Sequence, residues 1–272
     1  MSALCRRLGF STQTYYQGRR RKERRRVDEE LVVKLVAQER QLQPRLGTRK
    51  LRVRLKEELE KAGVQMGRDR FFEVLRAHHL LVEPYRAEYP ATTNSSHNLP
   101  IFHNLVRERE VQQAHEVWVS DLTYLRTEEG HLYLSLITDK KSRKVVGYHC
   151  GETLEASGCV QALEMALEQL PKEARPIHHS DRGCQYCSKE YVDKLTERGL
   201  QVSMTEQDHC AENALAERMN GILKSEYGLG YRLRSKAIAQ ALVKQAVHLY
   251  NTRRPHLSLE MNTPEQVHAL SA

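Results

Sequence analysis

The chain has 272 residues, of which 40% are hydrophobic and 29% charged, an ordinary globular composition with room for about two domains. It has no run near the roughly 18 apolar residues that a membrane helix needs, and residues 1–10 lack the apolar core of a signal peptide. These features exclude a membrane-spanning protein and favour a cytoplasmic one, in which the six cysteines stay reduced and form no disulfide framework.

Charge is distributed unevenly along the chain, whose formal net charge is +8. Residues 1–90 contain 22 of the 43 basic side chains but only 12 of the 35 acidic ones, so the remainder is slightly acidic. Concentrated positive charge attracts polyanions. We therefore expect the front of the chain to bind nucleic acid and the back to work through bound cations.

The first 40 residues are expected to be helical on both sides of a basic run. Two short helices joined by a tight turn are predicted first, the second with Ser11 as its N-cap. Residues 19–26 are basic at seven of eight positions. Such a run is typical of a solvated linker, but the charge asymmetry favours contact with DNA phosphates. Another helix is predicted from Asp28 to about Arg40.

A helix-turn-helix is predicted over about residues 48–77. Thr48 is expected to cap a helix in which leucines recur every four residues until Gly63 stops it, and a second helix is expected over residues 67–77. The start of the second helix of such a motif reaches base edges in the major groove. The candidate DNA contacts are Arg49, Arg68 and Arg70; the alternative is a plain helical bundle with solvated arginines.

Residues 84–113 are expected to connect two domains. Their first half is rich in Pro, Ser, Thr and Asn and has little periodicity. The predicted domains are thus a basic helical DNA-binding region (1–83), a linker (84–113) and a catalytic core (114–272).

Three consecutive strands are predicted at the start of the core, over residues 117–125, 131–138 and 144–150. The first is almost continuously apolar, as in a strand covered on both faces, yet Asp121 lies in its middle. An acid is rarely buried there without a partner, which favours a functional role for Asp121. Asp139, between the second and third strands, is interpreted as a turn-forming side chain.

Helices and strands then alternate. The predicted order is a helix over about 156–170, a strand over 177–180 that ends at Asp181, a helix over 188–198, a strand over 201–204, the helix of Glu217 and a last helix over about 235–250. This pattern predicts an α/β fold in which a mixed sheet has helices on its faces. It is the ribonuclease-H-like order, which would bring Asp121 beside Asp181.

Asp181 and Glu217 are the next candidate acids, and Lys224 follows Glu217 by seven residues. Seven residues are close to two helical turns, so Glu217 and Lys224 share one helix face. Neighbouring carboxylates repel each other, and divalent cations remove that repulsion: two-metal phosphoryl-transfer sites hold ions about 3.5–4 Å apart between carboxylates.

Cys184 and Cys187 form a CxxC, with His209 and Cys210 further on. Zinc binding by these four side chains is one interpretation. The favoured interpretation is that the cysteines are small buried or half-buried side chains beside the loop of Asp181.

Several blocks of the sequence resemble one family. The blocks are WVSDLTYL, HSDRGCQY, ENALAERMNGILKSE and YNTRRPHLSLEMNTPEQV, preceded by PRLGTRKLRVRLKEELEKAGVQMGRDRFFEVLRAHHLL. In their order and content they resemble the second-frame (OrfB) transposases of the insertion-sequence-three family, which have an integrase core; retroviral integrases are more distant relatives. The resemblance covers the core over about residues 117–267 and the helix-turn-helix before it. The chain departs from the family pattern at Cys184 and Cys187, where small hydroxyl residues are common, and at Glu212, where Asp is more usual.

The resemblance implies a ribonuclease-H-like integrase core with a mixed five-stranded sheet, preceded by an all-α helix-turn-helix domain. It places the family's acidic (DDE) triad on Asp121, Asp181 and Glu217, with two Mg²⁺ ions that Mn²⁺ can replace. It implies DNA contact by Lys224, and Arg182 flanks the same site. The implied activity is metal-dependent cleavage and strand transfer at the ends of a bacterial insertion sequence.

The implied partners are double-stranded DNA, both element ends and target, a homo-oligomer on that DNA, and the upstream-frame (OrfA) product, with no membrane. Two other classes stay open. A ribonuclease-H-like nuclease would share the triad without needing the helix-turn-helix, and a DNA-binding regulator or inactivated copy would not depend on Glu217.

Overall fold

The computed structural model describes residues 2–9, 11–85, 99–206 and 212–271. These residues form two compact units, Met1–Glu83 and Pro84–Ala272. Within the described residues, every helix is too short or too polar to cross a lipid bilayer.

The first unit is helical, with α1 (Ser2–Arg7), α2 (Thr12–Leu42), α3 (Thr48–Arg54), α4 (Lys56–Lys61) and α5 (Arg68–Ala77). The prediction of separate helices flanking a basic linker is wrong, because α2 runs without interruption through the arginine run. Ser11 is its N-cap, as predicted, and accepts a hydrogen bond from the Thr14 N–H at 3.0 Å. Arginine, lysine and glutamate are good helix formers, and the pairing of Arg26 with Glu23 and Glu30 supports the helix one turn away on either side.

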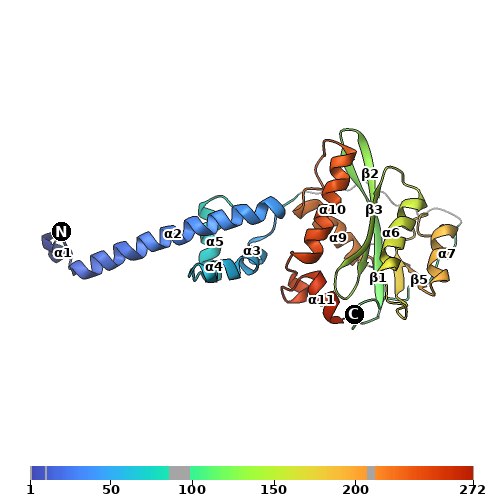
Figure 1. Ribbon diagram of the computed structural model, residues 1–272, viewed down its shortest axis with the longest axis horizontal. Coiled ribbons are helices and arrows are strands. Elements are labelled where there is room, and N and C mark those ends of the chain that lie inside the picture. Colours follow the sequence, from blue (N-terminus) through green and yellow to red (C-terminus); the bar gives the residue numbers. More distant parts are fainter. Residues whose placement is uncertain (1, 10, 86–98, 207–211, 272) are drawn as a thin grey trace. The chain divides into compact units, whose positions relative to one another are not determined.

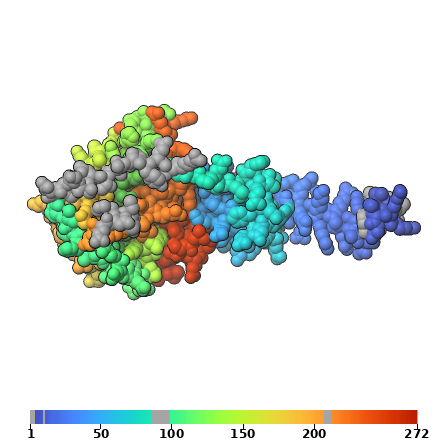
Figure 2. Space-filling view, turned by 180° about the vertical axis from the view of Figure 1, so that it is seen from behind, coloured from blue at the N-terminus to red at the C-terminus, as the bar shows by residue number. Residues whose placement is uncertain are grey.

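Only the carboxy-terminal part of α2 contributes to the apolar core of this unit. Val32 and Val36 of α2 pack with Leu51 of α3 and with Phe71 and Leu75 of α5. The amino-terminal half of α2, which carries the arginines, stands clear of α3–α5 (Figures 1 and 2). Its exposed side chains are therefore available to a polyanion along their whole length.

The predicted helix that begins at residue 48 is divided in the structure. Gly47, rather than Thr48, occupies the N-cap position, and the helix is interrupted at Leu55 between α3 and α4. Gly63, at a φ of 71°, ends α4 as predicted. All three leucines, at positions 51, 55 and 59, are buried. Their spacing of four residues therefore marks one buried face, although the helix is interrupted.

The second unit is built on a five-stranded sheet in the order β3-β2-β1-β4-β5. The strands are β1 (Val117–Thr127), β2 (Gly130–Asp139), β3 (Val145–Gly151), β4 (Ile177–Ser180) and β5 (Gln201–Met204). β1, β2 and β3 pair in antiparallel fashion, whereas β4 is parallel to β1 and β5 is parallel to β4. The predicted mixed sheet with the ribonuclease-H-like order is confirmed.

Helices cover both faces of this sheet (Figure 1). On one face, Trp118 packs with α6 (Ala156–Glu168) and α7 (Lys189–Glu197). On the other, Leu125 packs with α9 (Ala214–Glu226) and α10 (Lys236–Thr252). After α10 come a short 3-10 turn, Leu257–Leu259, and α11 (Pro264–Ser271), neither of which was predicted from the sequence.

Asp139 is fully buried at the turn between β2 and β3. Its carboxylate accepts hydrogen bonds from the Ser142 N–H at 2.8 Å, the Ser142 hydroxyl at 2.7 Å and the His115 N–H at 2.8 Å. These bonds fit the interpretation of Asp139 as a turn-forming side chain.

Gly147 of β3 is where α6 approaches the sheet most closely. A Cβ there would lie 2.1 Å from the Ala162 carbonyl oxygen and 2.9 Å from the Ala166 Cβ. Because these are backbone and short side-chain atoms of a packed helix, Gly147→Ala is expected to lower the free energy of unfolding by about 3 kcal/mol. Urea titration followed by the fluorescence of Trp118, the single tryptophan, measures this.

Gly221→Ala is the control: nothing lies within 4 Å of its Cβ position in α9, so unchanged or slightly higher stability is expected there. Equal effects of the two variants would contradict the prediction.

Candidate active site

The pairing of β1 with β4 determines which acids become neighbours. Val117 pairs with Ile177, Trp118 with His178 and Val119 with His179. Continued by two residues, this parallel register places Asp121 opposite Asp181, and the period of two places both side chains on the sheet face covered by α9. Both acids therefore lie where β4 ends and β1 continues, paired there with β2.

Glu217 is brought to the same place by α9, which two asparagines fix against β1. The Asn213 side chain donates to the Ser120 carbonyl at 3.0 Å, and the Asn220 side chain donates to Asp121 Oδ2 at 2.7 Å. Glu217 lies between them in the first turn, and its side chain is exposed. The three acids therefore come from β1, from the loop after β4 and from α9.

The charges of Asp181 and Glu217 both act on the carboxyl group of Asp121. Burial, and next the negative charge of Asp181, raise the pKa of Asp121 from 3.8 to about 7; Glu217 also raises it, while hydrogen bonds from Asn220 and the Leu122 N–H lower it. Like charges this close disfavour ionisation. The site thus concentrates negative charge that a cation would neutralise.

In the metal-free protein, Asp121→Asn is expected to raise the free energy of unfolding at pH 8 by about 2 kcal/mol. The folded-state pKa lies above the unfolded one, so ionised Asp121 destabilises the fold above pH 7, and this cost shrinks as pH falls from 7 towards 4. Urea titrations in EDTA at pH 8 and pH 5, followed by Trp118 fluorescence, test both parts. Equal stability of variant and wild type at pH 8 would contradict the expectation.

Carboxylate oxygens are the donors that Mg²⁺ prefers, so the three acids fit this ion in chemical type. In the part of the chain that the structure describes, no three His, Cys, Asp or Glu side chains are grouped closely enough to hold a metal ion. Instead, Asp121 is bonded to Asn220 and the Leu122 N–H, and Asp181 Oδ1 accepts from the Gly183 N–H at 3.0 Å. These bonds fix the carboxylates at the end of β4, beside the central strand β1, where a divalent ion would relieve their mutual repulsion.

Lys224 lies on the same face of α9 as Glu217, about two turns further along. Its ammonium donates to the Thr123 hydroxyl at 2.6 Å and lies 4.7 Å from the centre of the Tyr124 ring. Burial lowers the pKa of Lys224, although the charge of Asp121 acts in the opposite direction. Lys224 therefore stands beside β1 next to the acids, half-buried.

Arg182, adjacent to Asp181, is engaged by the backbone. Its guanidinium donates to the carbonyls of Thr205 at 2.7 Å and Glu206 at 3.1 Å, joining the Asp181 loop to the end of β5. The arginines of the first unit lie elsewhere on the chain: Arg49 is exposed at the start of α3, Arg68 pairs with Asp69, and Arg70 pairs with Glu29 and Glu73.

Two buried histidines, His178 and His179, lie in β4 just before Asp181. Ser120 and Tyr191 both contact Nε2 of His178, at 2.7 and 2.8 Å, and Ser203 contacts Nδ1 of His179 at 2.8 Å. Burial is the main cause that lowers the pKa of His178 to about 3 and of His179 to about 4. Both are therefore neutral at pH 7. The periodicity of the sequence did not predict which side chains contact them.

Among the described residues, the cysteines form no group that could hold a metal ion. Cys187 is buried in the α6–α7 core, where its thiol donates to the Met204 sulfur at 3.7 Å and burial raises its pKa to about 11. Cys184 is half-buried, and His209 and Cys210 lie outside the described residues.

The chain is similar to known integrase cores and to proteins of insertion elements. The family described as "Integrase core domain" matches residues 111–210, and a second family of that description matches residues 198–264. The chain is 34% identical over 99% of its length to the whole of the insertion element IS600 uncharacterized 31 kDa protein of Shigella sonnei. It is 33% identical over 78% of its length to 74% of transposase InsF for insertion sequence IS3A of Escherichia coli K12.

A solved structure shares the fold. The simian T-cell lymphotropic virus intasome, determined in complex with a PP2A regulatory subunit, matches 82% of this chain and 70% of its own, with 19% identity and a TM-score of 0.50. A likeness at this identity concerns the fold, and it agrees with the order of strands and helices described above.

Proposed function

The chain belongs to the insertion-sequence transposases that have an integrase core, and from this we propose that Asp121, Asp181 and Glu217 are its catalytic acids. The activity of the family is DNA transposition, a polynucleotidyl transfer. The observation that supports this assignment is that the charges of Asp181 and Glu217, which come from two other parts of the chain, both act on Asp121. A cluster of acids with a purely structural role would only lower the stability of the fold, because its like charges repel one another.

The three carboxylates would hold two Mg²⁺ ions, or Mn²⁺ in their place, which when bound activate the attacking oxygen and neutralise the departing one. Asn220 orients the Asp121 carboxylate through its 2.7 Å hydrogen bond. Lys224 would bind a DNA phosphate next to the scissile one.

Two successive displacements follow. In the first, water attacks a phosphodiester at the element end, breaks the bond to the 3′-oxygen and leaves a free 3′-hydroxyl. In the second, that hydroxyl loses its proton, attacks a phosphodiester of the target and displaces its 3′-oxygen. Neither step needs a serine, cysteine or tyrosine nucleophile, because no bond to the protein forms.

The helical first unit would bind the element ends. We propose that the arginine run of α2 and exposed Arg49 contact phosphates, and that Arg68 and Arg70, at the start of α5, reach base edges. We also propose that several copies of the chain assemble on the DNA and that the upstream-frame product is joined to the chain.

The test is a nicking and joining assay on labelled DNA with the element's own ends, in Mg²⁺ or Mn²⁺ and in EDTA, with and without the upstream-frame product fused to the chain. Metal-dependent joining supports a transposase. Cleavage without joining would favour a ribonuclease-H-like nuclease. DNA binding without chemistry, even in the fusion, would favour a regulator or an inactivated copy.

A further inference from the structure

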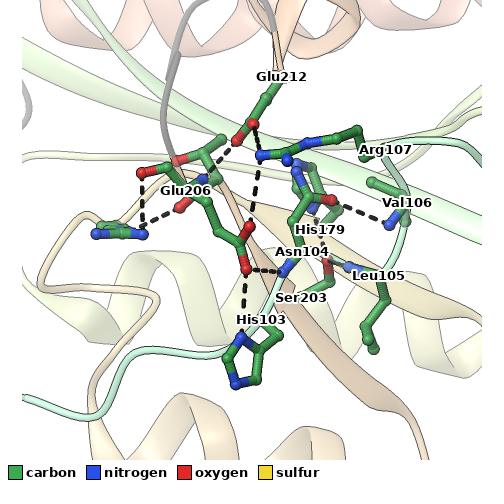
Figure 3. A network of polar contacts seen from close by, with 11 residues as sticks. His103, Asn104, Leu105, Val106, Arg107, His179, Ser203, Glu206 and Glu212 are labelled. Atoms are coloured by element: carbon green, nitrogen blue, oxygen red, sulfur yellow. Dashed lines mark hydrogen bonds and ion pairs between the residues drawn. The ribbon is translucent and has the colours of Figure 1, made fainter.

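Residues 102–107 lie within the predicted linker (84–113), yet they are bound to the core close to the start of α9. Val106 is buried with Val119 of β1 and Ala216 of α9. The backbone N–H of Asn104 donates to Glu206 at 3.0 Å, and that of Leu105 donates to the Ser203 hydroxyl at 2.9 Å (Figure 3). This segment is therefore part of the packed core.

Arg107 continues this attachment to Glu212, just before α9. Its guanidinium lies 2.5 Å from Glu212 Oε1 and 3.4 Å from Glu206 Oε2. The other Glu212 oxygen accepts the backbone N–H of Glu206 (Figure 3). The Glu212 side chain is only 10% exposed, so its carboxylate is held from two sides.

Glu217, by contrast, is positioned by its helix alone: the described residues offer its exposed carboxylate no ion pair or hydrogen bond. The start of that helix is fixed by Glu212 and by the Asn213 contact with β1, and the Glu217 N–H then bonds to the Asn213 carbonyl at 3.2 Å. Where α9 begins therefore decides where the Glu217 carboxylate lies.

We infer that Arg107 and Glu212 are positioning residues: their ion pair fixes the first turn of α9 and thereby holds Glu217 against Asp121 and Asp181. This inference rests on the proposed role of Glu217. Loss of Arg107 would remove the cation that Glu206 and Glu212 share, and the repulsion between the two carboxylates would displace the start of the helix. A shift of about 1 Å in a catalytic group can cost about 100-fold in rate.

Arg109 provides a matched control. It lies two residues further along the same segment and pairs with Glu116 at 3.7 Å rather than with a residue at the start of α9. Arg109→Ala therefore removes the same charge from the same segment without touching the helix of Glu217.

The experiment compares Arg107→Ala, Glu212→Gln, their double variant, Glu212→Asp and Arg109→Ala in the full chain. Joining is measured over a Mg²⁺ titration, DNA binding is measured in EDTA, and folding is checked by Trp118 fluorescence. We expect Arg107→Ala and Glu212→Gln each to slow joining about 10- to 100-fold and to raise the half-activating Mg²⁺ concentration. The double variant should be no worse than either single variant, Glu212→Asp should recover most activity, and DNA binding should be unchanged.

Amide hydrogen exchange over residues 213–220 decides the matter independently of activity. Faster exchange there in Arg107→Ala and Glu212→Gln, but not in Arg109→Ala, is expected. The inference is overturned if Arg107→Ala matches Arg109→Ala in exchange and in Mg²⁺ dependence, or if its loss of joining equals its loss of folded protein. A wild type without joining, or an active Glu217→Gln variant, would instead contradict the proposed function, and the exchange data would still test the ion pair.

Discussion

Replacing Glu217 with glutamine is expected to slow strand transfer by at least about 1,000-fold, since a ligand to catalytic metal ions accounts for several kcal/mol of transition-state stabilisation. The substitution keeps the size of the side chain and removes its charge. Because the Glu217 side chain is exposed and lies in the first turn of α9, folding should be little affected. Single-turnover joining of labelled element ends in Mg²⁺ measures the change.

Glu190 supplies the control, because it too is an exposed glutamate in the first turn of a helix, α7. Glu190→Gln alters the helix dipole interaction in the same way but lies on the opposite face of the sheet, away from Asp121. It should join DNA at the wild-type rate. If Glu217→Gln were as active as Glu190→Gln, the assignment of the third acid would be wrong.

Removal of Glu226 is expected to lower the free energy of unfolding by about 3–5 kcal/mol, because it would leave the Arg254 guanidinium buried without a counter-charge. Arg254 is only 2% exposed and donates two hydrogen bonds to Glu226, both 2.7 Å long. Its guanidinium also lies 5.6 Å from the Tyr250 ring centre. The pair joins the end of α9 to the chain leaving α10, and Asn251 beside it exchanges two 2.9 Å hydrogen bonds with the backbone of Val145.

Urea titration of Glu226→Ala, followed by Trp118 fluorescence, tests this value. The control is Glu265→Ala, which removes the partly exposed partner of Lys144 and should cost less than about 1 kcal/mol. The double variant Glu226→Leu with Arg254→Met should be closer to wild type than Glu226→Ala, since an apolar pair leaves no buried charge. A loss below about 1 kcal/mol for Glu226→Ala would show that water reaches Arg254. These contacts give Asn251 and Arg254 a structural role at the end of α10.

Local sequence signals predicted the elements that carry the acids. The apolar run around Asp121, the short strand before Asp181 and the helical spacing of Glu217 and Lys224 each depend on residues close together in the chain. For the same reason Ser11 was identified as an N-cap. The arginine run of α2 was misread, because a row of basic residues is compatible with both a linker and a helix, and the good helix propensity of arginine decided it.

The sequence by itself determined the types of side chain, their elements and the family, because these depend on short-range periodicity and on motifs that the chain displays directly. Only the tertiary structure decided the parallel register that aligns Asp121 with Asp181, and the attachment of Arg107 to Glu212, 105 residues away. Contacts over such separations depend on how the sheet and helices pack, and no local pattern encodes which partner fills a given space. The sequence therefore shows which residues make up the site, and the folding of the chain sets the distances between them.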